Sequence, residues 1–245
     1  MSESQTFVSH LVELRSRLIK AVLAIVIIVV IQLPFANKIY GIMAYPMMKY
    51  LPENSSMIAT GVFSPFFTPF KMVFILGFIL AMPFILYQIW AFVAPGLYKH
   101  EKRIAKPLLF SSIVLFYLGC LFAFFVIFPI LFQFLPAILP EHIIFMPDIN
   151  KYLDTIVRLF FAFGLAFEVP IAVILMILMN VTTPEKLTSN RPYVIIGVFV
   201  VGMLLTPPDP FSQTLMAIPM WALFEIGVIM GRILKQNPDN QKKQP

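Results

Sequence analysis

Ionisable residues and cysteine are scarce in this chain of 245 residues. Only 12% of the residues are charged, and Cys120 is the single cysteine. One cysteine excludes a disulfide within the chain and provides no thiolate cluster for a metal. The sequence also lacks the G-x-x-x-x-G-K-[ST] phosphate loop, the H-E-x-x-H zinc motif and the G-x-S-x-G nucleophile elbow. We therefore expect neither an enzyme nor a bound cofactor or metal.

Apolar residues make up 60% of the chain, and the mean hydropathy is +0.89. A soluble core of this size would not need so much apolar surface, so we predict an all-α, polytopic membrane protein in the lipid bilayer. The formal net charge of +6 does not indicate nucleic-acid binding, because most lysines and arginines flank apolar runs. The polar start of the chain has no cleavage pattern, so no removable signal peptide is expected.

Six apolar runs are candidates to span a membrane. They predict one transmembrane domain over residues 1–235, followed by a polar cytoplasmic tail at 236–245. The predicted spans are 18–35, 69–93, 107–132, 155–179, 192–205 and 211–229. With this arrangement, 13 of the 18 lysines and arginines lie on one side of the membrane. Positive residues mark cytoplasmic loops, so both termini are predicted to be cytoplasmic.

Prolines and short spans predict kinked helices around a concave face. Pro83, Pro129, Pro170 and Pro219 each remove a backbone hydrogen bond within a span. The last two spans are short, and the fifth would reach only roughly 21 Å across a hydrocarbon core of about 30 Å. The turn between them contains three prolines and Asp209 and cannot continue a helix. We expect this corner to thin the bilayer or to be covered by a partner helix.

The residues before the first span have helical periodicity. Phe7, Leu11, Leu14 and Leu18 recur at the spacing of one helix face. This pattern predicts an amphipathic helix that can lie at the membrane interface before the first span begins.

Glu168 lies near the middle of the fourth predicted span, where an ionised carboxylate is costly unless it is solvated or paired. It is either a structural carboxyl group or a polar contact for a translocating or partner segment. A proton-coupled small-molecule transporter that uses Glu168 is the alternative function, although no second ionisable residue lies deep in another span. Glu225 lies nearer the cytoplasmic end, within about two turns of Arg232, and is expected to serve as a structural ion-pair or cap partner.

Two acids, Glu13 and Glu101, lie inside basic clusters at the predicted cytoplasmic face. Acids contribute little to membrane topology, so a bound ligand would explain them better. Glu13 could instead pair with Arg17 four residues later, and Glu101 could be satisfied by neighbours such as Lys99. If the two carboxylates converge on a cationic ligand, arginine guanidinium groups match them best. A scaffold that organises membrane proteins without binding cargo is a further alternative.

Four segments carry long motifs, which together extend over most of the chain. They are HLVELRSRL at 10–18, WAFVAPGLYKHEKRI at 90–104, FEVPI at 167–171 and RPYVIIGVFVVGMLLTPPDPFSQTL at 191–215. In content and order they resemble the TatC family, the multi-spanning receptor of the twin-arginine protein translocation pathway. The resemblance includes the six spans and the cytoplasmic termini.

The resemblance implies a receptor in the bacterial inner membrane that binds the paired arginines of signal peptides on folded precursor proteins. It implies self-association, the single-span partners TatA and TatB, and transport driven by the proton-motive force. By motif position, the signal-peptide site would contain Glu13, Arg15, Phe92, Lys99 and Glu101. The intramembrane polar site would be Glu168, and the partner-helix docking site would contain Met203, Thr206 and Gln213. Functional positions on the periplasmic side would be Pro46, Phe66 and Asp209.

Overall fold

The computed structural model describes residues 3–51, 55–93, 102–137, 145–205 and 210–236, and their regular structure is almost entirely helical. The helical segments are α1 Glu3–Gln32, the 3-10 turn η1 Leu33–Phe35, α2 Ala36–Tyr50, α3 Ser64–Val93, α4 Lys102–Phe122, the π-helical η3 Ala123–Ile127, α5 Phe128–Ala137, α6 Ile149–Ala166, α7 Val169–Leu178, α8 Pro184–Ser189, α9 Arg191–Leu205 and α10 Pro210–Gln236. Within these ranges, the only β pairing is an isolated bridge between Ile58 and Asp148. The predicted all-α fold is confirmed.

Six apolar helical stretches occur in the described part of the chain. Leu11–Tyr50, Ser64–Phe92, Lys106–Phe134, Ile149–Leu178 and Gln213–Lys235 are long and apolar enough to cross a membrane, and Arg191–Leu204 is a shorter apolar helix. The fifth helix is short, as predicted, but the sixth is not, because α10 has 27 residues. Its apolar run ends near Ile229, yet no proline follows before Pro238, and the helix continues past Gly231 to Gln236.

The N-terminal helix is not a separate interfacial element. It forms one helix, α1, with the first span, and only η1 divides it from α2. The sequence between Leu14 and Gln32 contains neither glycine nor proline, so nothing interrupts the backbone hydrogen bonds there. Leu11, Leu14 and Leu18 are all exposed on this continuous helix.

The four span prolines have different effects on their helices. Pro83 lies inside the continuous helix α3, and Pro219 lies inside α10. In contrast, Pro129 is the second residue of α5, which begins directly after the π-helical segment η3, and Pro170 follows a turn at Glu168 that divides α6 from α7. Insertions of π-helix and proline turns are the usual causes of sharp helix kinks.

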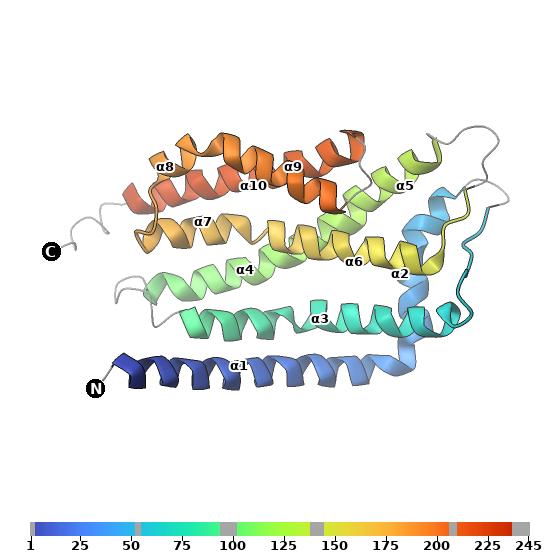
Figure 1. Cartoon of the computed structure of the whole chain (residues 1–245), viewed down its shortest axis with the longest axis horizontal. Helices are drawn as coiled ribbons and strands as arrows, with labels where there is room; N and C mark the ends of the chain where they lie inside the picture. Colours follow the sequence, from blue (N-terminus) through green and yellow to red (C-terminus); the bar gives the residue numbers. More distant parts are fainter. Residues whose placement is uncertain (1–2, 52–54, 94–101, 138–144, 206–209, 237–245) are drawn as a thin grey trace. The chain divides into compact units, whose positions relative to one another are not determined.

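The chain divides into two compact units. The first contains Met1–Met48, Ser56–Ile113 and Met146–Leu153. In this unit α1 runs alongside α3 (Figure 1), and the two helices approach closely at Gly77. A Cβ atom at Gly77 would lie 2.5 Å from Val29 Cγ2, so only glycine permits this approach without a shift.

A buried carboxylate, Asp148, fixes the segment before α3 to the start of α6 in the first unit. Its Oδ2 accepts hydrogen bonds from the Thr60 hydroxyl at 2.6 Å and the Thr60 amide at 2.9 Å. Its Oδ1 accepts from the amides of Asn150 and Lys151 and so caps α6. These hydrogen bonds, led by the one from the Thr60 hydroxyl, stabilise the ionised form and lower the pKa of Asp148 to about 2.

Further side chains of α6 extend this connection. The Asn150 amide group donates to the Ser64 hydroxyl, and its Oδ1 accepts from the Thr68 hydroxyl at 2.6 Å. The Tyr152 hydroxyl donates to the Met43 carbonyl of α2 at 2.6 Å. The start of α6 is therefore hydrogen bonded to both α2 and α3.

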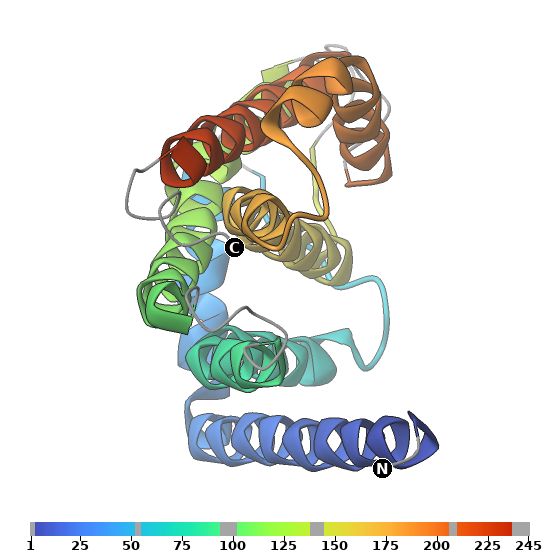
Figure 2. The ribbon, with the colours of Figure 1, turned by 90° about the vertical axis from the view of Figure 1, so that its left-hand side faces the viewer.

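The second unit contains Lys49–Ser55, Val114–Phe145 and Asp154–Pro245. In it α10 runs beside α7 and α9 (Figures 1 and 2). The α7–α10 contact is built on Val173, Ile177, Phe224 and Val228, which are buried together. A Cβ atom at Gly227 would lie 2.8 Å from Pro170 Cα, so the two backbones meet closely where α7 begins.

Candidate functional site

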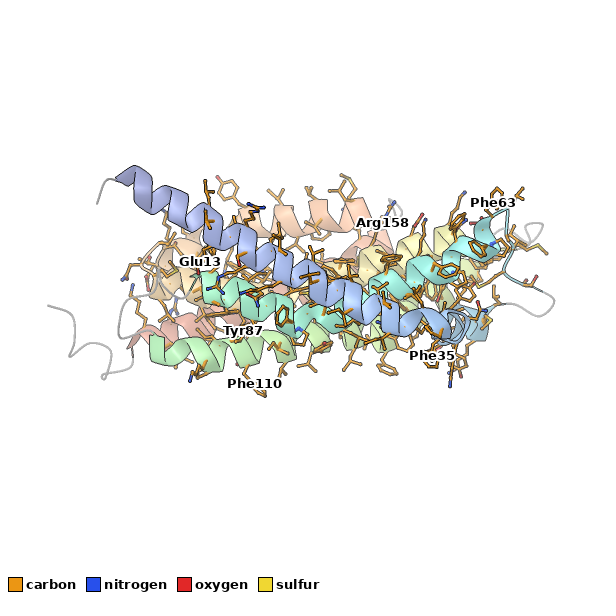
Figure 3. All side chains as sticks on the ribbon, turned by 90° about the horizontal axis from the view of Figure 1, so that it is seen from below. Glu13, Phe35, Phe63, Tyr87, Phe110 and Arg158 are labelled. Carbon is orange, nitrogen blue, oxygen red and sulfur yellow. The ribbon has the colours of Figure 1, made fainter. Side chains whose placement is uncertain are left out.

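The acid of the N-terminal motif, Glu13, is paired with an arginine of its own helix. Arg17 Nε and Nη2 both donate to Glu13 Oε1, at 2.9 and 2.5 Å. Arg17 Nη1 reaches across to the Oε1 atom of Gln88 on α3 at 3.4 Å. Figure 3 marks Glu13 on α1 and Tyr87, the neighbour of Gln88, on α3. The pairing of Glu13 with Arg17 that the spacing allowed is therefore present.

This pairing leaves part of the carboxylate accessible. The Glu13 side chain is 37% exposed, and the Arg17 side chain is 24% exposed. Both bonds use Oε1, and no described residue donates to Oε2. A carboxylate has lone pairs on both oxygens, so Glu13 can accept hydrogen bonds from a second guanidinium group while Arg17 keeps it oriented.

Other residues of the predicted signal-peptide site are only partly described. Arg15 is exposed on α1, and Phe92 is half-buried near the end of α3. Lys99 and Glu101 lie outside the described residues, so the expected convergence of Glu13 and Glu101 stays a prediction.

Gln88 is a residue that the sequence prediction did not include. It is buried, and it is the contact between the Glu13–Arg17 pair and α3. The sequence could have identified Gln88, because it is a polar residue inside the apolar run of the second span. Glu168 was identified in the same way, as a polar residue inside an apolar run.

Glu168 lies in the turn between α6 and α7, at the N-cap position of α7. Its amide donates to the Leu165 carbonyl at 3.0 Å, and its carbonyl accepts from the Ala172 amide at 3.0 Å. The side chain is half-buried, and its Oε1 atom is removed from solvent. A helix N-terminus favours negative charge, so the break at Pro170 provides a position where a carboxylate within the span costs less than in a continuous helix.

The predicted docking residues lie on α9 and at the start of α10. Met203 is 50% exposed on α9, and Gln213 of α10 donates its amide to the Phe199 carbonyl at 2.8 Å. Gly202 faces Gln213, since a Cβ atom there would lie 3.3 Å from Gln213 Cγ. Gln213 thus holds the start of α10 to α9. Thr206 lies outside the described residues.

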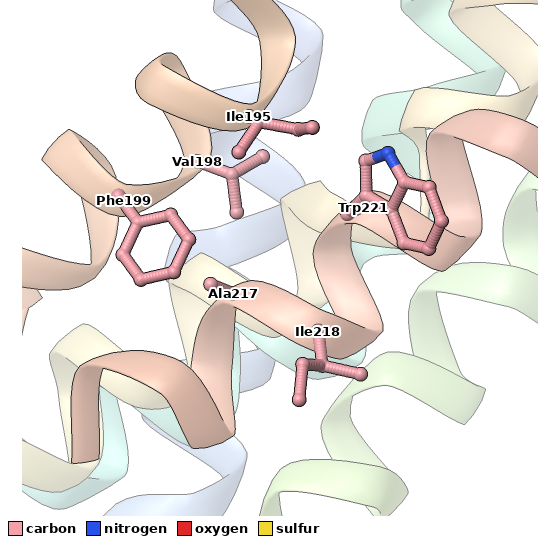
Figure 4. A pocket seen from close by; sticks show the side chains of 6 residues that line it. All are labelled: Ile195, Val198, Phe199, Ala217, Ile218 and Trp221. Atoms are coloured by element: carbon pink, nitrogen blue, oxygen red, sulfur yellow. The ribbon is translucent and has the colours of Figure 1, made fainter. Parts of the chain in front are cut away.

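A shallow apolar depression lies between α9 and α10. Its volume is about 230 Å³. The side chains that line it come equally from the two helices (Figure 4): Ile195, Val198, Phe199, Ala217, Ile218 and Trp221. The short helix α9 therefore presents apolar side chains both to this depression and outward, as Tyr193 and Ile196 do.

An ion pair fixes the other end of α9. Arg191 donates from Nε and Nη2 to the two carboxylate oxygens of Glu225, each at 2.6 Å. The expectation that Glu225 serves as a structural ion-pair partner is confirmed, and its cation is Arg191 rather than Arg232 of its own helix. Arg232 lies two turns further along α10, whereas α9 runs antiparallel to α10 and brings Arg191 opposite Glu225.

The predicted periplasmic residues differ in their surroundings. Pro46 is buried inside α2. Phe66 is exposed near the start of α3, and its ring lies 5.1 Å from that of Phe67 and 5.0 Å from that of Phe70. Asp209 lies outside the described residues.

Comparisons with known proteins agree with these features. Residues 9–219 match the family model described as "Sec-independent protein translocase protein (TatC)". The chain is 53% identical over 232 residues to the Sec-independent protein translocase protein TatC of Escherichia coli K12, covering 95% of this chain and 90% of the relative. It is 52% identical over 237 residues to that of Azotobacter chroococcum mcd 1, covering 97% and 93%.

A solved structure has the same fold. The crystal structure of the twin arginine translocase receptor TatC superposes with a TM-score of 0.82 at 40% identity, covering 93% of this chain and 100% of that one. These matches place the chain in protein transport rather than catalysis, and they give no support to the small-molecule transporter. The chain belongs to the TatC family of Sec-independent protein translocase proteins.

Proposed function

We propose that this protein is the receptor that captures twin-arginine signal peptides at the cytoplasmic face of the bacterial inner membrane. In this proposal residues 1–235 form one transmembrane domain, the tail at 236–245 is cytoplasmic, and both termini face the cytoplasm. Membership of the TatC family is the basis for the proposal. The half-exposed carboxylate of Glu13, which has one oxygen bonded to Arg17, is the structural observation that supports it.

Capture begins with the two arginines of the signal. One guanidinium binds Glu13 through Oε2, the other binds Glu101, and Arg15, Phe92 and Lys99 shape the surface around them. Arginine suits this role better than lysine, because its planar guanidinium can form two parallel hydrogen bonds with a carboxylate. The attraction between each guanidinium and its carboxylate acts at short range, because basic residues surround both acids, and it depends on ionic strength where the pair is exposed.

The apolar part of the signal then enters the membrane along the concave face of the helices. Glu168 offers it a polar contact within the span. Replacing Glu168 by glutamine keeps the hydrogen-bonding shape and removes the charge, so an export assay of that variant measures whether the charge is required.

Partner helices complete the translocation complex. TatA and TatB, each with a single span, bind the α9–α10 surface around Met203, Thr206 and Gln213, and further copies of this chain assemble with them. The surface suits a partner because α9 has only 15 residues, which is roughly 22 Å of helix, and leaves part of the membrane thickness uncovered. The proton-motive force drives transport.

Photo-crosslinking of a twin-arginine peptide tests the proposed receptor site. Glu13→Gln should weaken crosslinking about tenfold, because one charge-assisted hydrogen-bonding group is lost, and Glu101→Arg should abolish it. Glu185→Gln is the matched control, since Glu185 is an exposed acid on α8 outside the proposed site. Undiminished crosslinking in Glu101→Arg would reject the site. Equal crosslinking of a Lys-Lys peptide would favour a scaffold over a receptor.

A further inference from the structure

A second hollow, larger than the depression in Figure 4, lies in the second unit. It is bordered by α6, α7, α9 and α10 and has a volume of about 660 Å³. Apolar side chains make up nearly all of its wall, including Leu165, Val169, Val198 and Phe224. Arg158 of α6 is the single charged residue among the described residues that line it. We refer to it as the Arg158 groove.

Arg158 is unusual for an arginine within an apolar helix. It lies inside the stretch Ile149–Leu178, which is long and apolar enough to span a membrane, and its side chain is exposed (Figure 3). It forms no hydrogen bond or ion pair with any residue in the described ranges. Ionisable residues in membrane spans normally have a partner, and the exposed guanidinium of Arg158 is suited to an anionic group.

We propose that the Arg158 groove is a lipid site. One acyl chain of an anionic phospholipid lies along its apolar wall, and the phosphate of the same lipid binds the Arg158 guanidinium. Arginine and phosphate form bidentate, charge-assisted hydrogen bonds, which supplies the charge complementarity. The chain from Arg158 to Val169 runs along this groove, through α6 and past the turn at Glu168 to the start of α7.

The chemistry of the groove suits a lipid. Among the described residues its wall is apolar and carries one cation, Arg158. An acyl chain needs no polar partner along such a wall, and the phosphate of the same lipid binds the cation.

The proposal goes beyond signal-peptide recognition and does not depend on it. Neither Glu13 nor Glu168 lines the Arg158 groove. Lipid binding and signal binding are therefore separable by mutation.

Native mass spectrometry of the full-length, purified protein tests the headgroup contact. The protein is stripped of lipid in detergent and mixed with equal amounts of phosphatidylglycerol and phosphatidylcholine. The wild type should retain one phosphatidylglycerol, and Arg158→Gln should lower the retention of phosphatidylglycerol relative to phosphatidylcholine about tenfold. Arg232→Gln removes an exposed arginine at the end of α10 and should leave the ratio unchanged. Equal retention of the two lipids by the wild type, or an unchanged ratio in Arg158→Gln, would overturn the proposal.

A second pair of variants tests the acyl-chain contact. Gly197 lines the groove, and a Cβ atom there meets nothing within 4 Å, so Gly197→Leu should fill the groove without a clash. This variant should retain neither lipid. Gly41→Leu makes the same change on α2, where a Cβ atom also meets nothing within 4 Å, and should behave as the wild type.

The outcomes separate lipid from other occupants. If Gly197→Leu keeps the lipid but loses crosslinking to the twin-arginine peptide, the groove belongs to the peptide and the lipid proposal is wrong. If Gly197→Leu loses the lipid and keeps crosslinking, the groove binds lipid and is not part of the signal-peptide site. A monodisperse size-exclusion profile checks folding, and should Gly197→Leu fail that check, the ratio measured for Arg158→Gln decides the question.

Discussion

Two helix pairs in this protein, α1–α3 and α9–α10, share an antiparallel arrangement but are held by different interactions. In each pair an arginine of the first helix reaches the second helix. Arg17 directs two hydrogen bonds to its own helix and one, at 3.4 Å, to Gln88. Arg191 directs both of its hydrogen bonds across the pair, each at 2.6 Å, to Glu225.

The difference distinguishes a site that can receive a ligand from an ion pair whose hydrogen-bonding groups are already used within the protein. Glu13 retains an oxygen to which no described residue donates, and α1 packs on α3 through the close approach at Gly77. Glu225 uses both oxygens on Arg191, and only 15% of its side chain is exposed. We therefore expect substitutions in the Glu13–Arg17 pair to affect ligand binding. Substitutions in the Arg191–Glu225 pair should affect stability.

Removal of the Arg191–Glu225 pair should have the largest effect on stability. Glu225→Ala leaves Arg191 without its two hydrogen bonds and releases one end of the short helix α9 from α10. The thermal unfolding midpoint in detergent should fall by several degrees. Arg232→Ala, two turns further along α10, should change it little. A smaller loss in Glu225→Ala than in Arg232→Ala would contradict the assigned pair.

Asp148 should make the stability of the first unit depend on acid pH. Its pKa in the folded protein is about 2, below its ordinary value of 3.8. The folded state therefore holds the proton less strongly than the unfolded state, and the extra stability is fully present above pH 3.8. It is lost as the pH falls through 2 and amounts to about 2 kcal/mol.

A pH series of unfolding midpoints measures this loss. Asp148→Asn should flatten the dependence between pH 4 and pH 2 because the titrating group is absent. Asp154→Asn, which changes an acid within α6, is the comparison variant. An equal flattening in both variants would show that Asp148 is not the main source.

The exposed faces of α1 and α9 provide a matched test of lipid against partner contact. Ile27 of α1 is 59% exposed, and Ile196 of α9 is 61% exposed. If α9 is covered by a partner helix, Ile196→Ala should cost about 1.5 kcal/mol of partner binding, because a buried isoleucine contact is lost. Ile27→Ala should cost little, since lipid chains refill the space. Co-purification of a single-span partner with each variant measures the difference, and equal losses would remove the distinction between the two helices.

The sequence was sufficient to predict the class of the protein and its apolar helices. Long apolar runs determine which segments can lie in a membrane, because each must satisfy its backbone hydrogen bonds internally. The short fifth helix followed from the three prolines after it, while the longer α10 was missed because a polar sequence can continue a helix that packing has already started.

Partners in space were harder to predict. Glu225 had a cation on its own helix, Arg232, but the structure pairs it with Arg191, 34 residues earlier in the chain. Likewise, Pro83 and Pro170 look equivalent in the sequence, yet only Pro170 follows a break. The partner of a side chain and the effect of a proline both depend on which helix lies opposite. The spacing of residues along one helix does not reveal that neighbour. The pairing of Glu13 with Arg17 could be predicted from the sequence, because both residues lie on one helix, about one turn apart.

Substitution of Gln88 should have the smallest effect on stability and should still alter the ligand site. Gln88→Leu keeps the volume of a buried side chain and removes the hydrogen bond to Arg17, which at 3.4 Å is long. We expect the free energy of unfolding to change by less than about 1 kcal/mol.

Arg17 would then be held to Glu13 alone and would lose its fixed position against α3. If Glu13 must be oriented to receive a guanidinium, crosslinking of a twin-arginine peptide should fall a few-fold in Gln88→Leu although stability is nearly unchanged. Gln32→Leu is the matched control, since Gln32 is also a buried glutamine of the first unit and its amide donates to a carbonyl of its own helix. If crosslinking rises in Gln88→Leu, Arg17 competes with the ligand for Glu13 instead of orienting it, and the contrast between the two helix pairs would then rest on exposure alone.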